Sequence, residues 1–268
     1  MRLLTHLTGE KTFRLATLSI LALLVLFLTV IIASLVAYTD RHALLSTLVS
    51  DEILFAIKLS LTTATVATIF SMAIAIPVAY AVSQADFPGK DIIDTILDLP
   101  IVISPVALGA ALLVFFNTPI GSAIENRLLG FVFEVPGIVL AQFTVVVALA
   151  IRLLKSTFDS IDPRYEQVGR TLGCSKARVF VRVILPLAKN GLIAAAVLTW
   201  ARAVGEFGAT VTLAGATKMK TETLPVAIFL NLATANVERA IGVIFILIAI
   251  AAGALFALRR IIGKRQQI

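Results

Sequence analysis

Long runs of apolar residues are the feature that most constrains this chain. They cover residues 15–37, 53–82 and 241–258 and show no strict alternation with polar residues. In lipid, a helix satisfies its own backbone hydrogen bonds, whereas a membrane β-barrel needs a period-two pattern. With 59% hydrophobic and 15% charged residues, the 268-residue chain also lacks the polar surface of a soluble enzyme. We therefore predict an all-α polytopic membrane protein.

Six apolar segments are long enough to cross a bilayer about 30 Å thick. We place these spans at 15–37, 53–83, 93–116, 137–155, 190–213 and 240–260. The third span contains Pro100 and Pro105, which predict a kinked helix. The first is longer than the apolar core of a signal peptide, so we interpret it as a span.

The basic residues predict the orientation. Both termini are expected in the cytoplasm, with the chain in an inner or plasma membrane, because Lys and Arg favour cytoplasmic connections. The net charge of +7 then reflects topology, so we expect lipid as a partner and no nucleic acid. Sixteen of the 23 Lys and Arg residues fall on one side of the predicted spans: Arg2, Lys11, Arg14, Lys90, Arg152, Lys155, Arg164, Arg170, Lys176, Arg178, Arg182, Lys189, Arg259, Arg260, Lys264 and Arg265.

The connection over residues 156–186 is too long to be a simple link between two helices. Asp162 before Pro163 is typical of a helix start, and Gly173 stands where a left-handed helix end belongs. Ser175 should begin a second short helix. The segment is therefore either an amphipathic elbow resting on the bilayer or a docking element for a soluble partner.

The same connection resembles the signature loop of ABC importer permeases. Two further stretches, "WARAVGEFGATVTLAG" and "DFPGKDIIDTILDLPIVISPVALGAALL", resemble permeases for molybdate, tungstate and sulfate, most closely those for molybdate. In that loop, an acidic-Ala-Ala triplet is followed at fixed spacing by Gly, an apolar residue and Leu-Pro. The matching positions here are Gln167-Val168-Gly169, preceded by Glu166, and then Gly173, Val183 and Leu185-Pro186.

The resemblance implies a type I ABC importer permease fold with no cofactor of its own. Its organisation would be a tail and first span over 1–50, a permease core over 51–262 and a cytoplasmic tail over 263–268. It further implies a homodimer, two cytoplasmic ABC ATPase subunits and an extracytoplasmic oxyanion-binding protein, importing molybdate, tungstate or sulfate. Whether Glu166 or Gln167 makes the family's polar contact stays open. The implied ATPase-coupling residues are Pro163, Glu166, Gln167, Gly169, Gly173, Leu185 and Pro186.

The fifth span contains candidate residues of the translocation pathway. Arg202 and Glu206 lie four apart, so on one helix they would share a face and form either a structural ion pair or part of a gate. Gly205 and Gly208 permit close helix packing. Hydroxyl groups such as those of Thr210 and Thr212 would suit a passing oxyanion better than fixed cations.

Two other functions are weighed against the permease. A secondary transporter could relay protons through Asp94 and Asp98, although acids at a helix start are also favoured by the helix dipole. A membrane enzyme would cluster its reactive groups, yet His6 and His42 are predicted at opposite faces and Cys174 is the only cysteine. Because no Gly-rich phosphate loop occurs, we expect no ATP site. We also expect no catalytic residues and no metal site.

Overall fold

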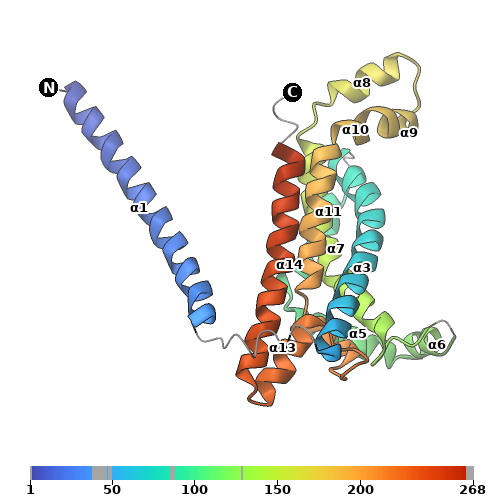
Figure 1. The fold of residues 1–268 in the computed structure, drawn as a ribbon. Helices are drawn as coiled ribbons and strands as arrows, with labels where there is room; N and C mark the ends of the chain where they lie inside the picture. The colour runs from blue at the N-terminus through green and yellow to red at the C-terminus, as the bar shows by residue number, and fades with distance from the viewer. Residues whose placement is uncertain (1, 38–46, 48–49, 85–87, 128, 264–268) are drawn as a thin grey trace.

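The computed structural model describes residues 2–37, 47, 50–84, 88–127 and 129–263, and the regular elements in this part of the chain are helices (Figure 1). The predicted all-α class is therefore confirmed. The elements are α1 (Arg2–Ala37), α3 (Asp51–Gln84), α4 (Lys90–Val102), α5 (Pro105–Phe116), α6 (Pro119–Arg127), α7 (Val135–Asp159), α8 (Arg164–Thr171), α9 (Lys176–Val179), the π-helical turn η1 (Phe180–Ile184), α10 (Leu185–Leu187), α11 (Lys189–Val204), α12 (Gly208–Ala214), α13 (Leu224–Ala233) and α14 (Val237–Gly263).

Within the described part of the chain, four helices are individually long and apolar enough to cross a membrane: α3, α7, residues Phe13–Ala37 of α1 and residues Val237–Ile261 of α14. The number reaches six if each of two bent helix pairs is counted as one span, which agrees with the prediction of about six spans. These pairs are α4 with α5, and residues Lys176–Leu187 with α11.

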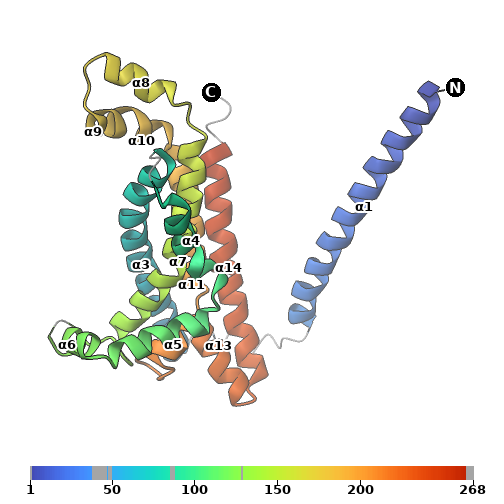
Figure 2. The same ribbon diagram turned by 180° about the vertical axis from the view of Figure 1, so that it is seen from behind.

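The bundle is organised around α3 and α7. Small residues at helical spacing line the buried face of α3, so the two helix backbones approach closely, as membrane helices require when no hydrophobic force drives them together. Pro77 lies inside α3 without ending it. In both views α1 stands apart from this bundle (Figures 1 and 2). The buried small residues of α3 include Ser60, Ala64, Ala67, Ser71, Ala75 and Ala79.

The expectation of one kinked helix over 93–116 is wrong. The chain breaks between α4 and α5, which are bent by 108°. Ser104 precedes a proline and adopts an extended conformation, and its hydroxyl accepts the N–H of Ala107 to cap α5. Pro100, in contrast, lies within α4. Figure 2 shows α5 lying across the end of the bundle opposite α8.

The expectation of one continuous span over 190–213 is also wrong, because α11 ends at Val204 and α12 begins at Gly208. The apolar helix α13 follows and lies beside the start of α14 (Figure 1). The beginning of α1 and the end of α14 lie at the same end of the molecule as α8 (Figure 1). His6 lies in α1, whereas His42, residues 85–87 and the predicted tail beyond Gly263 fall outside the described residues.

Candidate functional site

The elbow, residues 160–188, comprises α8, α9, η1 and α10 at one end of the bundle. Its start follows the sequence signals. The carboxylate Oδ1 of Asp162 accepts the N–H of Arg164 at 2.9 Å, and Pro163 already has helical torsion angles. At the other end of α8, Gly173 has φ +81°, which confirms the predicted left-handed residue.

The second arm of the elbow begins where Ser175 accepts the N–H of Arg178 at 3.4 Å. It continues through η1 and α10 and then bends by 73° into α11. Pro186 lies inside α10, before that bend. The buried Ala188 stands at the turn, and α11 begins at Lys189.

The two faces of α8 differ in character. Tyr165, Val168 and Leu172 are exposed by 53%, 57% and 79%, an unusual surface for large apolar side chains. Glu166 turns toward the bundle, where its Oε2 accepts the hydroxyl of Tyr80 in α3 at 3.0 Å. Gln167 is exposed whereas Glu166 is partly buried, and both side chains line a polar cleft between α8 and the end of α3.

The predicted ion pair of Arg202 and Glu206 is present, with Nη1 and Oε2 2.7 Å apart. The sequence pattern predicted that both residues lie on one helix, but the structure does not place them so, because α11 ends at Val204. Glu206 follows the end of α11, and its Oε1 accepts the N–H of Ala209 at 3.0 Å. This bond gives a partner to one of the N–H groups that are unpaired within the first turn of α12. The side chain of Glu206 is only 1% exposed, and each of its carboxylate oxygens has a polar partner, as a buried charge requires.

The two glycines of this region differ. A Cβ on Gly208 would lie 3.0 Å from the backbone nitrogen of Val106, so the predicted close packing is confirmed there, between α12 and α5. Gly205 is exposed, and its Cβ would meet only carbonyls of its own helix, at 3.7 Å or more. Within this chain, the close packing expected at Gly205 is therefore absent.

The hydroxyl groups suggested for the anion pathway lie inside the bundle. Thr210 is fully buried, and its Oγ1 has no hydrogen-bond partner. Thr212 donates to the carbonyl of Gly208 at 2.7 Å. In this conformation neither threonine offers a free hydroxyl on an open surface.

Two acids of α4, Asp94 and Asp98, are paired with bases of α7, a relationship that the sequence did not reveal. Asp98 forms an ion pair with Arg152. Asp94 lies 4.0 Å from Lys155, which also contacts Asp159 at 3.4 Å. These ion pairs connect α4 to α7. They explain the presence of Asp94 and Asp98 by a structural role, so no role in proton transfer is needed.

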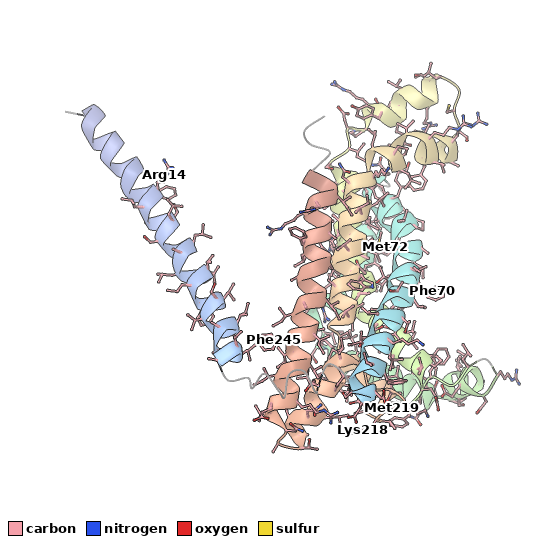
Figure 3. All side chains as sticks on the ribbon, in the orientation of Figure 1. Arg14, Phe70, Met72, Lys218, Met219 and Phe245 are labelled. Atoms are coloured by element: carbon pink, nitrogen blue, oxygen red, sulfur yellow. The ribbon has the colours of Figure 1, made fainter. Side chains whose placement is uncertain are left out.

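A second ionic cluster, also missed by sequence reasoning, lies at the opposite end of the bundle, where Figure 3 labels Lys218 and Met219. Glu52 contacts Lys218 at 2.7 Å and Arg239 at 3.1 Å. Glu222 is 1% exposed and accepts the N–H of Met219 at 3.4 Å. Burial, followed by the nearby carboxylate of Glu52, raises the pKa of Glu222.

The sequence is similar to those of permeases from other organisms. The probable molybdenum ABC transporter permease protein of Haloferax volcanii is 35% identical over 251 residues, covering 91% of this chain and 89% of that protein. The molybdate/tungstate transport system permease protein WtpB of Thermococcus kodakarensis is 31% identical over 227 residues, covering 85% of this chain and 86% of that protein.

Solved structures with this fold include a bacterial alginate ABC transporter in complex with an alginate pentasaccharide-bound periplasmic protein. The matched chain gives a TM-score of 0.75 at 17% identity, covering 97% of this chain and 96% of that one. At that identity the likeness concerns the fold alone. It confirms the ABC importer permease architecture expected from the sequence.

Residues 67–266 match the family described as binding-protein-dependent transport system inner membrane component. The match includes the elbow, the broken fifth span and most of the helical bundle. This chain therefore belongs to that family and is a multi-pass membrane permease subunit of an ABC importer.

Proposed function

We propose that the permease imports molybdate or tungstate into the cytoplasm. The main support for this proposal is the near full-length similarity to the probable molybdenum permease of Haloferax volcanii. The similarity to the molybdate/tungstate permease of Thermococcus kodakarensis adds to it. Sulfate, a smaller tetrahedral oxyanion of the same charge, is the third candidate substrate. In this proposal the core is 51–262, flanked by segments 1–50 and 263–268.

The elbow docks a cytoplasmic ABC ATPase subunit through the outer face of α8. Tyr165, Val168 and Leu172 supply an apolar strip that an ATPase groove would cover. The exposed base Arg164, next to Tyr165 in the chain, favours an acidic rim on the groove, whereas Arg170 and Lys176 line the cleft between α8 and α3. The abundance of basic residues at this end supports a cytoplasmic position for the elbow and both termini.

In this proposal, the ATPase-coupling residues act in two groups. Glu166 and Gln167 line the cleft between α8 and the end of α3, and Gly169 packs against Val179 in the second arm of the elbow. Pro163 and Gly173 shape the two ends of α8. Leu185 and Pro186 stiffen the arm that leads to the bend at Ala188, so that the elbow moves as a lever.

Two copies of the chain would each hold one ATPase subunit, and a binding protein would deliver the anion at the opposite end. Gly205 lies in an apolar groove of about 290 Å³ between α11 and α14, which the second copy would cover. Arg202, Glu206, Gly208 and Thr210 then lie close to the seam. Movement at the break between α11 and α12 would open or close the pathway there.

The substrate is tested with the subunit purified together with its ATPase and reconstituted with the cognate binding protein. We expect molybdate or tungstate to stimulate ATP hydrolysis and to accumulate in the vesicles. Stimulation by sulfate alone would contradict the assignment. Uptake by the permease without any ATPase would contradict the proposed coupling.

The docking face is tested with Leu172→Asp, which places a charge on the most exposed residue of the strip, at the end of α8. We expect loss of ATPase co-purification while the subunit still inserts into the membrane. Met219→Asp is the matched control, because Met219 is 52% exposed at the opposite end of the bundle. If Leu172→Asp retains the ATPase as well as the control does, docking through α8 is wrong.

A further inference from the structure

The elbow helix α8 has few means of transmitting force to the bundle. The chain enters and leaves α8 through short irregular segments, 160–163 and 172–175. A polar cleft of about 420 Å³ separates part of α8 from the end of α3, with Ala81 and Gln84 on one side and Gln167, Arg170 and Lys176 on the other. A push on α8 must therefore cross this cleft through specific contacts.

Tyr80 makes such a contact from the last turns of α3. Its hydroxyl donates to Oε2 of Glu166 at 3.0 Å, across 86 residues of sequence. A hydrogen bond to a carboxylate is among the stronger ones a neutral donor can make. The bond joins the side of α8 opposite the docking strip directly to a membrane-spanning helix.

The ring of Tyr80 is held by two phenylalanines from different elements. Its centroid lies 4.4 Å from that of Phe180 in η1 and 5.7 Å from that of Phe158 in α7. Phe158 and Phe180 also approach each other, at 6.3 Å, and Phe158 is fully buried. The three rings form an aromatic triad that locks the orientation of the hydroxyl.

Phe180 begins the π-helical turn, a conformation that is rare and frequently found at functional positions. The two arms of the elbow thus meet at one side chain. The first arm reaches Tyr80 through Glu166, and the second reaches it through Phe180. Any rigid displacement of the elbow must either carry α3 with it or break these contacts.

We infer that Tyr80 is the positioning residue that passes movement of the coupling helix to α3, through its hydrogen bond to Glu166. This inference rests on the proposed docking of an ATPase by α8. The hydrogen bond and ring contacts of Tyr80 involve neither the docking strip nor the pathway residues of α11 and α12. Its removal should therefore separate ATP hydrolysis from transport while leaving ATPase binding intact.

The test is Tyr80→Phe in the complete transporter, reconstituted with ATPase and binding protein. The ring and its packing remain, and only the hydroxyl is lost. We expect normal ATPase co-purification and a ratio of ATP hydrolysed to oxyanion imported that rises about tenfold, the factor that one hydrogen bond to a charged group represents in an equilibrium. An unchanged ratio, or loss of ATPase binding, would overturn the inference.

Ser83→Ala provides the matched control. Ser83 lies three residues further along α3 and also donates a hydroxyl to a carboxylate, but that carboxylate is Asp159 at the end of α7, at 2.5 Å. Its loss should leave the ratio unchanged. A rise equal to that of Tyr80→Phe would show that any hydroxyl loss at this end uncouples the transporter, and would also overturn the inference.

The route through Glu166 is tested with Glu166→Ala and the double variant. If the two residues act through one bond, adding Tyr80→Phe to Glu166→Ala changes the ratio by less than about twofold, instead of about tenfold. Two independent, fully multiplying effects would overturn the route. Failure of the docking proposal is seen separately, as unchanged ATPase binding in Leu172→Asp with the wild-type Tyr80.

Discussion

Gly169 of α8 and Val179 of α9 lie in direct contact, because a Cβ atom on Gly169 would stand 2.8 Å from Cγ2 of Val179. Val179 is 1% exposed and β-branched, so its side chain has little freedom to move away. The glycine therefore sets the distance between the two arms of the elbow. Since the signature triplet ends at this residue, its smallness has a steric cause.

Gly169→Ala should push α8 away from α9. Overpacking of this kind costs about 1–3 kcal/mol, and here it also displaces Glu166 from Tyr80. We expect reduced oxyanion uptake and weaker ATPase binding, measured in proteoliposomes and by co-purification.

Adding Val179→Ala removes the two methyl groups that clash, and it should restore much of the lost uptake. Val179→Ala alone serves as the control for the cavity that it creates. If the double variant is as poor as Gly169→Ala, the contact with Val179 is not the reason for the glycine.

Gly173→Ala tests the backbone at the end of α8. No neighbouring atom lies within 4 Å of the added Cβ, so the effect comes from the left-handed torsion, which costs about 1–2 kcal/mol for alanine. Gly89, at φ +88° and equally free of neighbours, is a matched control. Both alanine variants should lower the unfolding temperature in detergent, but only Gly173→Ala should weaken ATPase binding. Equal ATPase binding by the two variants would count against a special role for Gly173.

The elbow was predictable because its signals are local. Asp162, Pro163, Gly173 and Ser175 each fix the backbone within a few residues of themselves, and the structure follows them. The helical class followed in the same way from uninterrupted apolar runs. These features needed no knowledge of which helices touch.

The breaks within the third and fifth spans were missed for two different reasons. Ser104-Pro105 is itself a readable helix start, but the apolar pattern continues across it and favoured one kinked helix. At the second break, Glu206 both pairs with Arg202 and caps α12. The spacing of four residues suggested the ion pair, but it is the same in a continuous helix and in a broken one. It therefore gave no sign that Glu206 caps a new helix.

The contacts between Tyr80 and Glu166 and between Asp98 and Arg152 join residues far apart in the chain. Tertiary packing alone creates them, so the sequence pattern of either element carries no sign of its partner. The same holds for Glu222, whose burial depends on how the connection 215–223 folds against α3 and α14.

Glu206 should be sensitive to both of its bonds. Glu206→Gln keeps an oxygen for the N–H of Ala209 but loses the charge that faces Arg202, a loss of about 2 kcal/mol. Glu206→Ala also removes the cap of α12 and leaves a cavity. We expect unfolding temperatures in the order wild type, Gln, Ala. Equal unfolding temperatures for the Gln and Ala variants would show that the cap contributes nothing.

Glu222 makes the stability of the end opposite the elbow depend on pH. Burial and the carboxylate of Glu52 raise the pKa of Glu222 above its ordinary value of 4.5, more than the N–H of Met219 and the nearby Lys218 and Arg239 lower it. Between that ordinary value and the raised one, the folded protein binds more protons than the unfolded chain. Its free energy of unfolding must therefore fall as the pH rises through this window.

Glu222→Gln removes this dependence, because glutamine stays neutral at every pH. Below pH 4.5 the wild-type carboxyl is protonated in both states, so the two proteins should differ least there. As the pH rises, the variant should become progressively more stable than the wild type, until the carboxyl of the folded protein has ionised and the difference levels off. Thermal unfolding in detergent at a series of pH values measures this difference. A difference that stays constant with pH, or that shifts in favour of the wild type as the pH rises, would contradict the raised pKa.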